Sequence, residues 1–165
     1  MIGVGNALRG DDAVGLEVAG RLADLRREPG VEVRAYEGEG VGLIDLWEGA
    51  GAVVLIDCMR SGAAPGTVRR IDASSTAVRV PLRGTSSHAT GVAEAIELAR
   101  ALGALPETVV VHGVEGASFA TGAELSEAVA GALVQAEDAA RAEVLRLLAG
   151  PRRGSRRRAR SAPAP

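Results

Sequence analysis

The chain has 165 residues, of which 47% are hydrophobic and 24% charged, and this is enough for one globular domain with a substantial core. The formal net charge is −2, but it is unevenly distributed. Residues 151–165 carry six arginines and no acid, which leaves 13 arginines against 21 acidic residues in residues 1–150. An acidic domain with a short basic tail excludes an ordinary nucleic-acid-binding fold.

Cysteine content and hydropathy limit the cellular compartments in which the protein is expected to work. Cys58 is the only cysteine, so no intramolecular disulfide can form and a reducing compartment is expected. No uncharged apolar run approaches the ~18 residues of a membrane span, and the N-terminus lacks the pattern of a signal peptide. We therefore expect a cytoplasmic monomer that does not bind membranes, with one domain at residues 1–150 and a disordered tail at residues 151–165.

The stretch Gly3–Gly15 predicts a strand end, a glycine turn and the start of a helix. From Asp12 onward, apolar residues recur at helical spacing, so a helix is predicted to run to about Arg27. Ligands of open α/β sheets gather where strands end and helices begin. The turn therefore belongs to a candidate site.

Two interpretations of this turn compete. A dinucleotide-binding turn fits poorly, because the third glycine position holds Leu8 and two carboxylates, Asp11 and Asp12, stand where a pyrophosphate needs positive potential. A carboxylate site, either metal ligand or general base, fits better. One Asp can simply cap the helix, but one cap does not need both. We assign Asp11 to capping and Asp12 to chemistry.

The first strand is short, because only Met1 and Ile2 precede Gly3. A buried strand usually has about five residues. We expect either an unusually short strand or further β-prone residues upstream in the native protein.

The rest of the chain predicts alternating strands and helices. Strands are expected at 31–36, 52–57, 66–71 and 108–114, with the third antiparallel because its connection is short. Helices are expected at 43–49, from 89 to about 102, and from an N-cap at Ser126 to Leu148. A glycine-rich loop at 37–42 and a long loop at 72–87 complete the pattern. It predicts a three-layer α/β/α sandwich on a five-stranded mixed, mostly parallel twisted sheet.

Asp12, Asp57 and His88 come from three separate strand or helix junctions in this topology. Two carboxylates and one imidazole suit a first-row divalent ion, with the rest of its coordination open. The ligand set does not choose among nickel, zinc and manganese.

Nucleophilic catalysis is the rival mechanism. Cys58 follows Asp57, so strand alternation directs it to the other side of the sheet, into packing. Ser86 and Ser87 lack a G-x-S-x-G elbow and are interpreted as loop and cap residues. His112, in mid-strand, is at least as well explained as a partly buried sheet histidine.

Four blocks of the chain resemble the hydrogenase maturation protease family, in order and at similar spacing. They are the motif Gly3–Gly15, the strand end at residues 54–57, the pair at residues 87–88, and residues 113–119 with 122–129. The resemblance covers roughly residues 1–148. The ordered set is more specific than the first block alone.

The resemblance implies an aspartic-type, nickel-recognising endopeptidase. Its members remove the C-terminal extension of the [NiFe]-hydrogenase large-subunit precursor after nickel has been loaded, and the nickel is thought to belong to the substrate. The family's metal-contacting residues fall on Asp12, Asp57 and His88. Other divalent ions could substitute for nickel.

The resemblance also has a departure and leaves an alternative. Many members carry a Gly-Gly-Thr-type segment after the second strand, implicated in substrate choice, where this chain has Glu37–Gly40. The hydrogenase partner is therefore not specified. A non-catalytic metal-recognition or chaperone module on the same fold is the alternative function.

Overall fold

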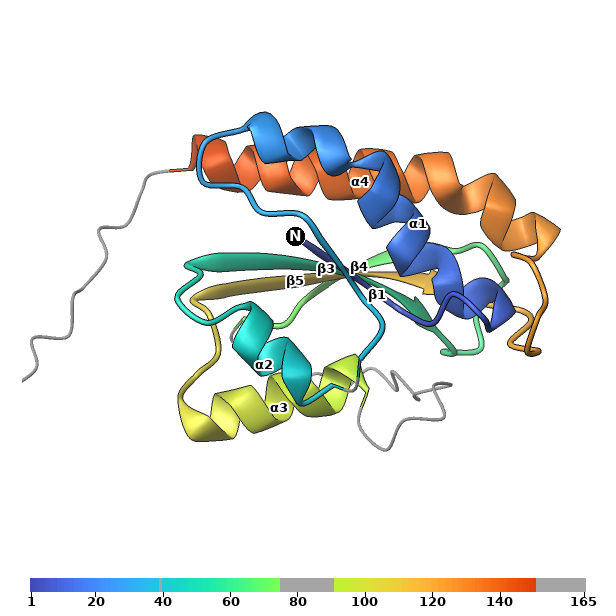
Figure 1. Cartoon of the computed structure of the whole chain (residues 1–165), viewed down its shortest axis with the longest axis horizontal. Helices are drawn as coiled ribbons and strands as arrows, with labels where there is room; N and C mark the ends of the chain where they lie inside the picture. The colour runs from blue at the N-terminus through green and yellow to red at the C-terminus, as the bar shows by residue number, and fades with distance from the viewer. Residues whose placement is uncertain (39, 75–90, 151–165) are drawn as a thin grey trace, which may run out of the picture.

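The computed structural model describes residues 1–38, 40–74 and 91–150 (Figure 1). Five strands form one sheet: β1 (Ile2–Val4), β2 (Arg34–Tyr36), β3 (Ala52–Met59), β4 (Val68–Asp72) and β5 (Thr108–Glu115). The α-helices are α1 (Val14–Arg21), α2 (Gly42–Leu46), α3 (Val92–Leu102) and α4 (Glu127–Ala149). Two 3₁₀ turns, η1 (Gly10–Ala13) and η2 (Ala23–Arg27), flank α1.

The sheet has the strand order β2-β1-β3-β5-β4, in which only β4 is antiparallel to its neighbour. The mixed, mostly parallel sheet predicted from the sequence is confirmed. The strand predicted at 66–71 is antiparallel, as expected, but the prediction that it pairs with the preceding strand was wrong, because β4 pairs with β5 and not with β3. The long parallel ladder of β3 with β5, from Ala52 opposite Thr108 to Met59 opposite Glu115, occupies that side of β3.

Each strand extends only as far as the neighbouring strand can pair with it. β2 is shorter than the predicted strand at 31–36, because β1 offers only three residues, with Ile2 opposite Arg34 and Val4 opposite Tyr36. β3 continues two residues beyond the predicted end at Asp57, to Met59, because β5 remains paired with it. Asp57 is therefore near the carboxyl end of the strand but is not its last residue.

The single helix predicted from Asp12 to Arg27 is divided into η1, α1 and η2. Its apolar residues still lie along one buried face, where Val14, Val18 and Leu22 are fully buried. After α1 the backbone tightens, and the N–H of Leu25 donates to the carbonyl of Leu22 over 3.1 Å. This three-residue spacing keeps Leu25 on the core side.

Two helices cover each face of the sheet, which confirms the three-layer sandwich (Figure 1). On one face, α1 and α4 pack over the alternate β3 residues Val54, Ile56 and Cys58. On the other face, α2 and α3 pack over Val53 and Leu55. Small and branched aliphatic side chains fill both layers, as the scarcity of aromatic residues requires.

Glycines allow α1 to lie directly on the strands. A Cβ at Gly3 would overlap the carbonyl oxygen of Gly15, and a Cβ at Gly15 would overlap the carbonyl oxygens of Val4 and Ile56. The helix backbone therefore contacts β1 and β3 with no side chain between them. This contact fixes the start of α1, and the residues just before it, against the carboxyl ends of two central strands.

The later helices begin near the predicted positions. α3 starts at Val92, three residues after the predicted start at 89, and the N–H of Gly91 donates to Glu94 Oε2 over 3.0 Å. Ser126 is the N-cap of α4, and its Oγ accepts from the N–H of Val129. Among the described residues, no helix is both long and apolar enough to cross a membrane.

Candidate functional site

The loop that follows β1 is held in place on both sides. The N–H of Ala7 donates to Glu37 Oε2 over 3.1 Å, and the carbonyl of Leu8 accepts from the N–H of Gly122 over 2.8 Å. The N–H of Asn6 also donates to the carbonyl of Asp12 over 3.1 Å. The loops after β1, β2 and β5 are thus joined around the start of η1 at one edge of the sheet.

Asp11 has a different role from the one expected. It does not cap its own helix, since η1 has no side-chain cap and Asp11 lies within it, fully buried. Its carboxylate instead accepts from the N–H groups of Ala117, Ser118 and Ser126 over 2.6–2.8 Å. Ser126 Oγ donates to it as well, over 2.9 Å.

These hydrogen bonds explain why a carboxylate is tolerated in the interior. Burial alone would raise the pKa of Asp11, but the N–H groups of Ser118, Ser126 and Ala117 together hold it below its usual value. Asp11 therefore remains charged and ties the loop between β5 and α4 to η1. The assignment of Asp11 to helix capping was wrong, and its role is to join distant segments.

Asp12 and Asp57 lie close enough for their charges to interact. Asp12 is buried in η1, and Asp57 lies near the end of β3 with partial exposure. Burial, and after it the charge of the Asp12 carboxylate, raise the pKa of Asp57 to about 8. Two carboxylates arranged in this way favour a bound cation, because a cation relieves both the repulsion and the desolvation.

His88, the third predicted ligand, lies outside the described residues, as do Ser86 and Ser87. Within residues 1–38, 40–74 and 91–150, no three His, Cys, Asp or Glu side chains are placed to hold a metal ion. The described part of the site is therefore a pair of carboxylates. His88 as a ligand stays a prediction.

Glu115 is a structural carboxylate that the sequence did not single out. It is buried at the end of β5 and accepts from Ser61 N–H, Ser61 Oγ and Gly62 N–H over 2.7–2.9 Å. Burial opposes its ionisation, but these bonds keep its pKa below the usual value. Glu115 fixes the connection from β3 to β4 as Asp11 fixes the connection from β5 to α4.

Cys58 takes the packing role predicted for it. Its side chain is buried in the layer beneath α1 and α4, on the face opposite to Asp57. Burial raises the pKa of its thiol well above the ordinary value, and the Asp57 charge adds to the shift. A thiol that stays protonated is a poor nucleophile.

His112 is a buried sheet histidine, as predicted, and faces α4. Its Nε2 lies 3.9 Å from Glu143 Oε2, and among the described residues neither ring nitrogen has a hydrogen-bond partner. Glu143 is paired with Arg70 and with Arg146. This cluster lies beneath the C-terminal half of α4, apart from Asp57 on the other face of the sheet.

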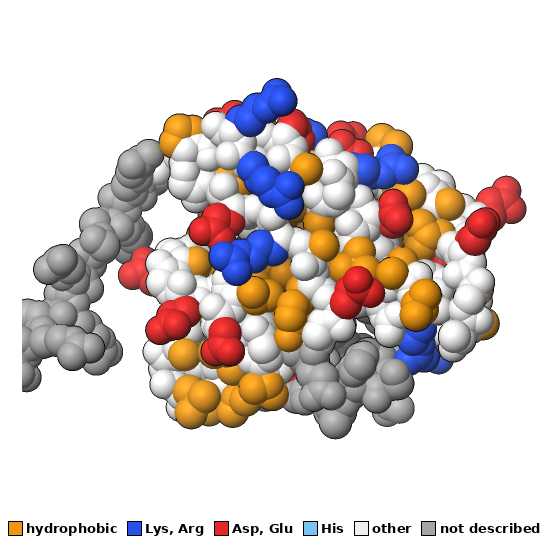
Figure 2. Space-filling model, in the orientation of Figure 1, with side chains coloured by type: hydrophobic (Ala, Val, Ile, Leu, Met, Phe, Trp, Pro, Cys, Tyr) orange, Lys and Arg blue, Asp and Glu red, His pale blue; other side chains and the backbone are white. Residues whose placement is uncertain are grey.

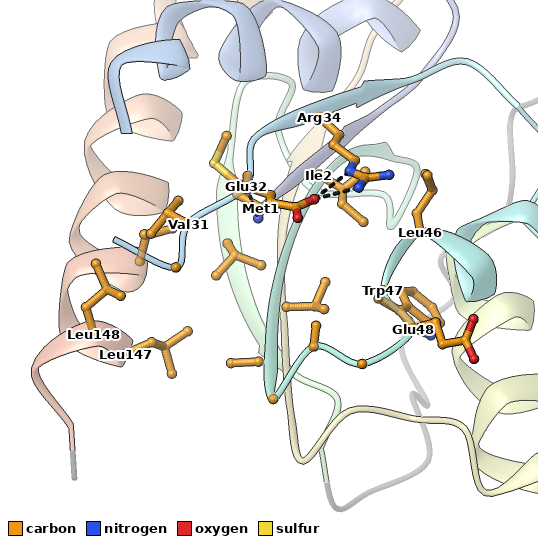
Figure 3. Close-up of a pocket in the computed structure, with 18 of the residues that line it drawn as sticks. Met1, Ile2, Val31, Glu32, Arg34, Leu46, Trp47, Glu48, Leu147 and Leu148 are labelled. Atoms are coloured by element: carbon orange, nitrogen blue, oxygen red, sulfur yellow. Dashed lines mark hydrogen bonds and ion pairs between the residues drawn. The ribbon is translucent and has the colours of Figure 1, made fainter. Parts of the chain in front are cut away.

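A cavity lies at the amino ends of β1, β2 and β3, at the opposite end of these strands from the carboxylates (Figure 3). Its volume is about 470 Å³, and Arg34 and Glu32 form an ion pair at its wall. The start of β3 also borders this space. It extends beyond the paired part of β1, because Ile2 of β1 lies opposite Leu55 of β3. Apolar side chains from four segments also line it: Met1, Ile2, Val31, Trp47, Leu147 and Leu148.

Comparison with known proteins points to one family. The family model described as hydrogenase maturation protease matches residues 22–143. The hydrogenase expression/formation protein HupD of Rhodobacter capsulatus is 28% identical over 151 residues, or 90% of this chain and 70% of that protein. HupM of Azotobacter chroococcum is 29% identical over 120 residues, or 72% of this chain and 57% of that protein. The chain thus spans between about half and 70% of the curated relatives that it matches.

Solved structures give the same result. The [NiFe] hydrogenase maturation protease HycI from Thermococcus kodakarensis is 28% identical, with a TM-score of 0.60 over 88% of this chain and 90% of that chain. The hydrogenase maturating endopeptidase HybD from E. coli has a TM-score of 0.71 at 21% identity, over 88% and 91% of the two chains. The likeness to HybD shows that this chain and HybD share a fold.

Proposed function

Because the chain belongs to the hydrogenase maturation protease family, we propose that it is an endopeptidase that removes the C-terminal extension of a nickel-loaded [NiFe]-hydrogenase large-subunit precursor. The observation that supports this role best is the Asp12–Asp57 pair at the carboxyl edge of the central strands. The pair lies beside loops that hydrogen bonds hold in place. The precursor would be the partner, and the protein would act as a monomer.

The nickel in this proposal belongs to the substrate. Asp12, Asp57 and His88 would contact it, and the precursor's own ligands would complete its coordination. The repulsion between Asp12 and Asp57 supports this, since it favours a divalent cation and disfavours an anionic cofactor. A precursor without nickel would then lack the charge that the site is built to receive.

Hydrolysis in this site would use water as the nucleophile. Water would add to the scissile carbonyl carbon while its proton passes to a carboxylate of Asp12 or Asp57. The C–N bond of the tetrahedral intermediate would then break as this proton is transferred to the leaving amine. The substrate's metal would polarise the carbonyl or the water. The buried, protonated Cys58 takes no part.

A non-catalytic metal-recognition or chaperone module would use the same three residues without cleaving the precursor. The family match and the proteases of the same fold favour catalysis over this alternative. Incubation with the nickel-loaded precursor separates the two functions. A chaperone would leave the mass of the precursor unchanged.

The decisive experiment follows cleavage by mass spectrometry, with nickel-loaded and nickel-free precursor side by side. Wild-type protein should cleave only the loaded form. Asp12→Asn and His88→Ala should each lower the rate by at least about a hundredfold, since each removes a group from the reacting centre. Cys58→Ala should retain cleavage. Equal cleavage of both precursors, or inactivity of Cys58→Ala beside a normal Asp12→Asn, would overturn the proposal.

A further inference from the structure

Leu8 is a large apolar side chain held in solvent beside the candidate site. It is 69% exposed, the highest value among the large hydrophobic residues that the structure describes. Most of the other exposed ones lie on the outer surfaces of α3 and α4, and Figure 2 shows such a group over α3. Leu8 lies instead in the loop after β1, four residues before Asp12.

The backbone of Leu8 is fixed on both sides of its Cα. Its N–H donates to Asn6 Oδ1 over 2.9 Å, and its carbonyl accepts from the N–H of Gly122 over 2.8 Å. A freely moving loop could fold an exposed leucine against the core. These bonds prevent that, so the exposure of Leu8 is built into the loop.

The same loop is tied to the catalytic segment. The N–H of Asn6 donates to the carbonyl of Asp12 over 3.1 Å, and the N–H of Asp12 donates to the carbonyl of Arg9 over 3.2 Å. Leu8 is thus on a short, hydrogen-bonded turn whose other end carries Asp12.

We infer that Leu8 is an anchoring residue, which inserts into an apolar depression of the precursor next to the segment that is cleaved. The inference rests on the proposed function and adds a contact that sets affinity. A loop whose backbone is already held by hydrogen bonds loses little backbone entropy when its apolar side chain is buried. Full burial of a leucine side chain corresponds to about a ten- to hundredfold gain in affinity.

Steady-state cleavage of the nickel-loaded precursor tests this, with kcat and KM measured separately. Leu8→Asp should raise KM by about ten- to hundredfold and leave kcat within about twofold, because the residue does not touch the reacting atoms. Leu8→Ala should raise KM several-fold, and Leu8→Met should restore it. Val134→Asp on α4 is the matched control, since Val134 is 62% exposed and far from the site in the chain, and its KM should match wild type.

An unchanged KM in Leu8→Asp, or a fall in kcat alone, would overturn the anchoring role. Binding of the precursor by the Asp12→Asn protein, with and without Leu8→Asp, separates this inference from the proposed function. Leu8-dependent binding without cleavage by wild type would contradict the protease activity alone. Leu8-independent binding would contradict the anchor alone, and neither binding nor cleavage by the wild-type protein would contradict both.

Discussion

At the residue scale, the adjacent carboxylates of Asp11 and Asp12 have different roles, one in hydrogen bonding and the other in the charge of the candidate site. Asp11 accepts four hydrogen bonds from residues 117–126, whereas Asp12 contributes its charge to the pair with Asp57. The partners of Asp11 are 106–115 positions away in the chain. Sequence spacing could therefore predict a site at this position and separate Asp12 from a structural Asp11, but it could not identify the distant groups that Asp11 binds.

The first prediction contrasts these two residues. Asp11→Asn replaces one carboxylate oxygen by an amide that faces N–H donors, so the free energy of unfolding should fall by about 2–3 kcal/mol. Asp12→Asn should leave it unchanged or raise it, because the repulsion of Asp57 is removed. Urea denaturation of both variants measures the difference. Equal destabilisation of the two would show that the assignment is mistaken.

At the element scale, local sequence patterns predicted which segments form strands and helices. They predicted less well how long each strand is and which strand it pairs with. The apolar alternation of β3 correctly separated Cys58 from Asp57, because alternation is a property of the strand itself. The length of β2 and the partner of β4 depend on other strands, and no local pattern contains that information. The break at Leu22 likewise follows from packing on the sheet.

The contact of α4 with the sheet gives a second prediction. His112 has no hydrogen-bond partner among the described residues and borders a cavity of about 330 Å³ beneath α4. His112→Phe would remove two unsatisfied polar atoms and use part of this space, so the free energy of unfolding should rise by about 1 kcal/mol. Thermal denaturation tests this, and a lower midpoint would contradict it.

Glu143 provides the opposite case on the same helix. Its buried carboxylate pairs with Arg70 and with Arg146. Glu143→Gln should lower the free energy of unfolding by about 1–2 kcal/mol, and no more, because both guanidinium groups remain hydrated at the surface. An unchanged free energy of unfolding in the same denaturation series would mean that the ion pairs of Glu143 contribute nothing to stability.

At the scale of the whole molecule, buried ionisable groups make stability depend on pH in opposing directions. The pKa of Asp57 is raised from 3.8 to about 8, so its contribution to stability falls as pH rises between these values. His112 and Glu143 act in the opposite direction. Burial lowers the pKa of His112 below its ordinary 6.5, so the unfolded chain binds that proton first and the contribution of His112 to stability falls as pH drops below about 6.5. The hydrogen bond from Arg70 is the main cause that lowers the pKa of Glu143 to about 2 from 4.5. A second loss of stability therefore occurs as pH falls from about 4.5 toward 2.

Variants assign each step to its group. Relative to wild type, His112→Phe should gain stability as pH falls below about 6.5, and Glu143→Gln should lose less stability as pH falls below 4.5. Asp11 and Glu115, whose pKa values are also lowered, should retain part of the second step. The measurement is the free energy of unfolding in urea between pH 7 and 3. A pH profile that neither variant changes would contradict these assignments.

The two outer strands of the sheet bear on how the protein behaves at high concentration. β2 has only three residues, and the exposed residues of β4 include Arg69, Arg70 and Asp72. Short edges and edge charges both discourage a second chain from adding a strand to the sheet. Arg69→Val would leave β4 more apolar without touching the core, so light scattering should detect aggregates that the surface control Arg27→Val does not form. Resistance to aggregation would then depend in part on the charged residues of one five-residue strand.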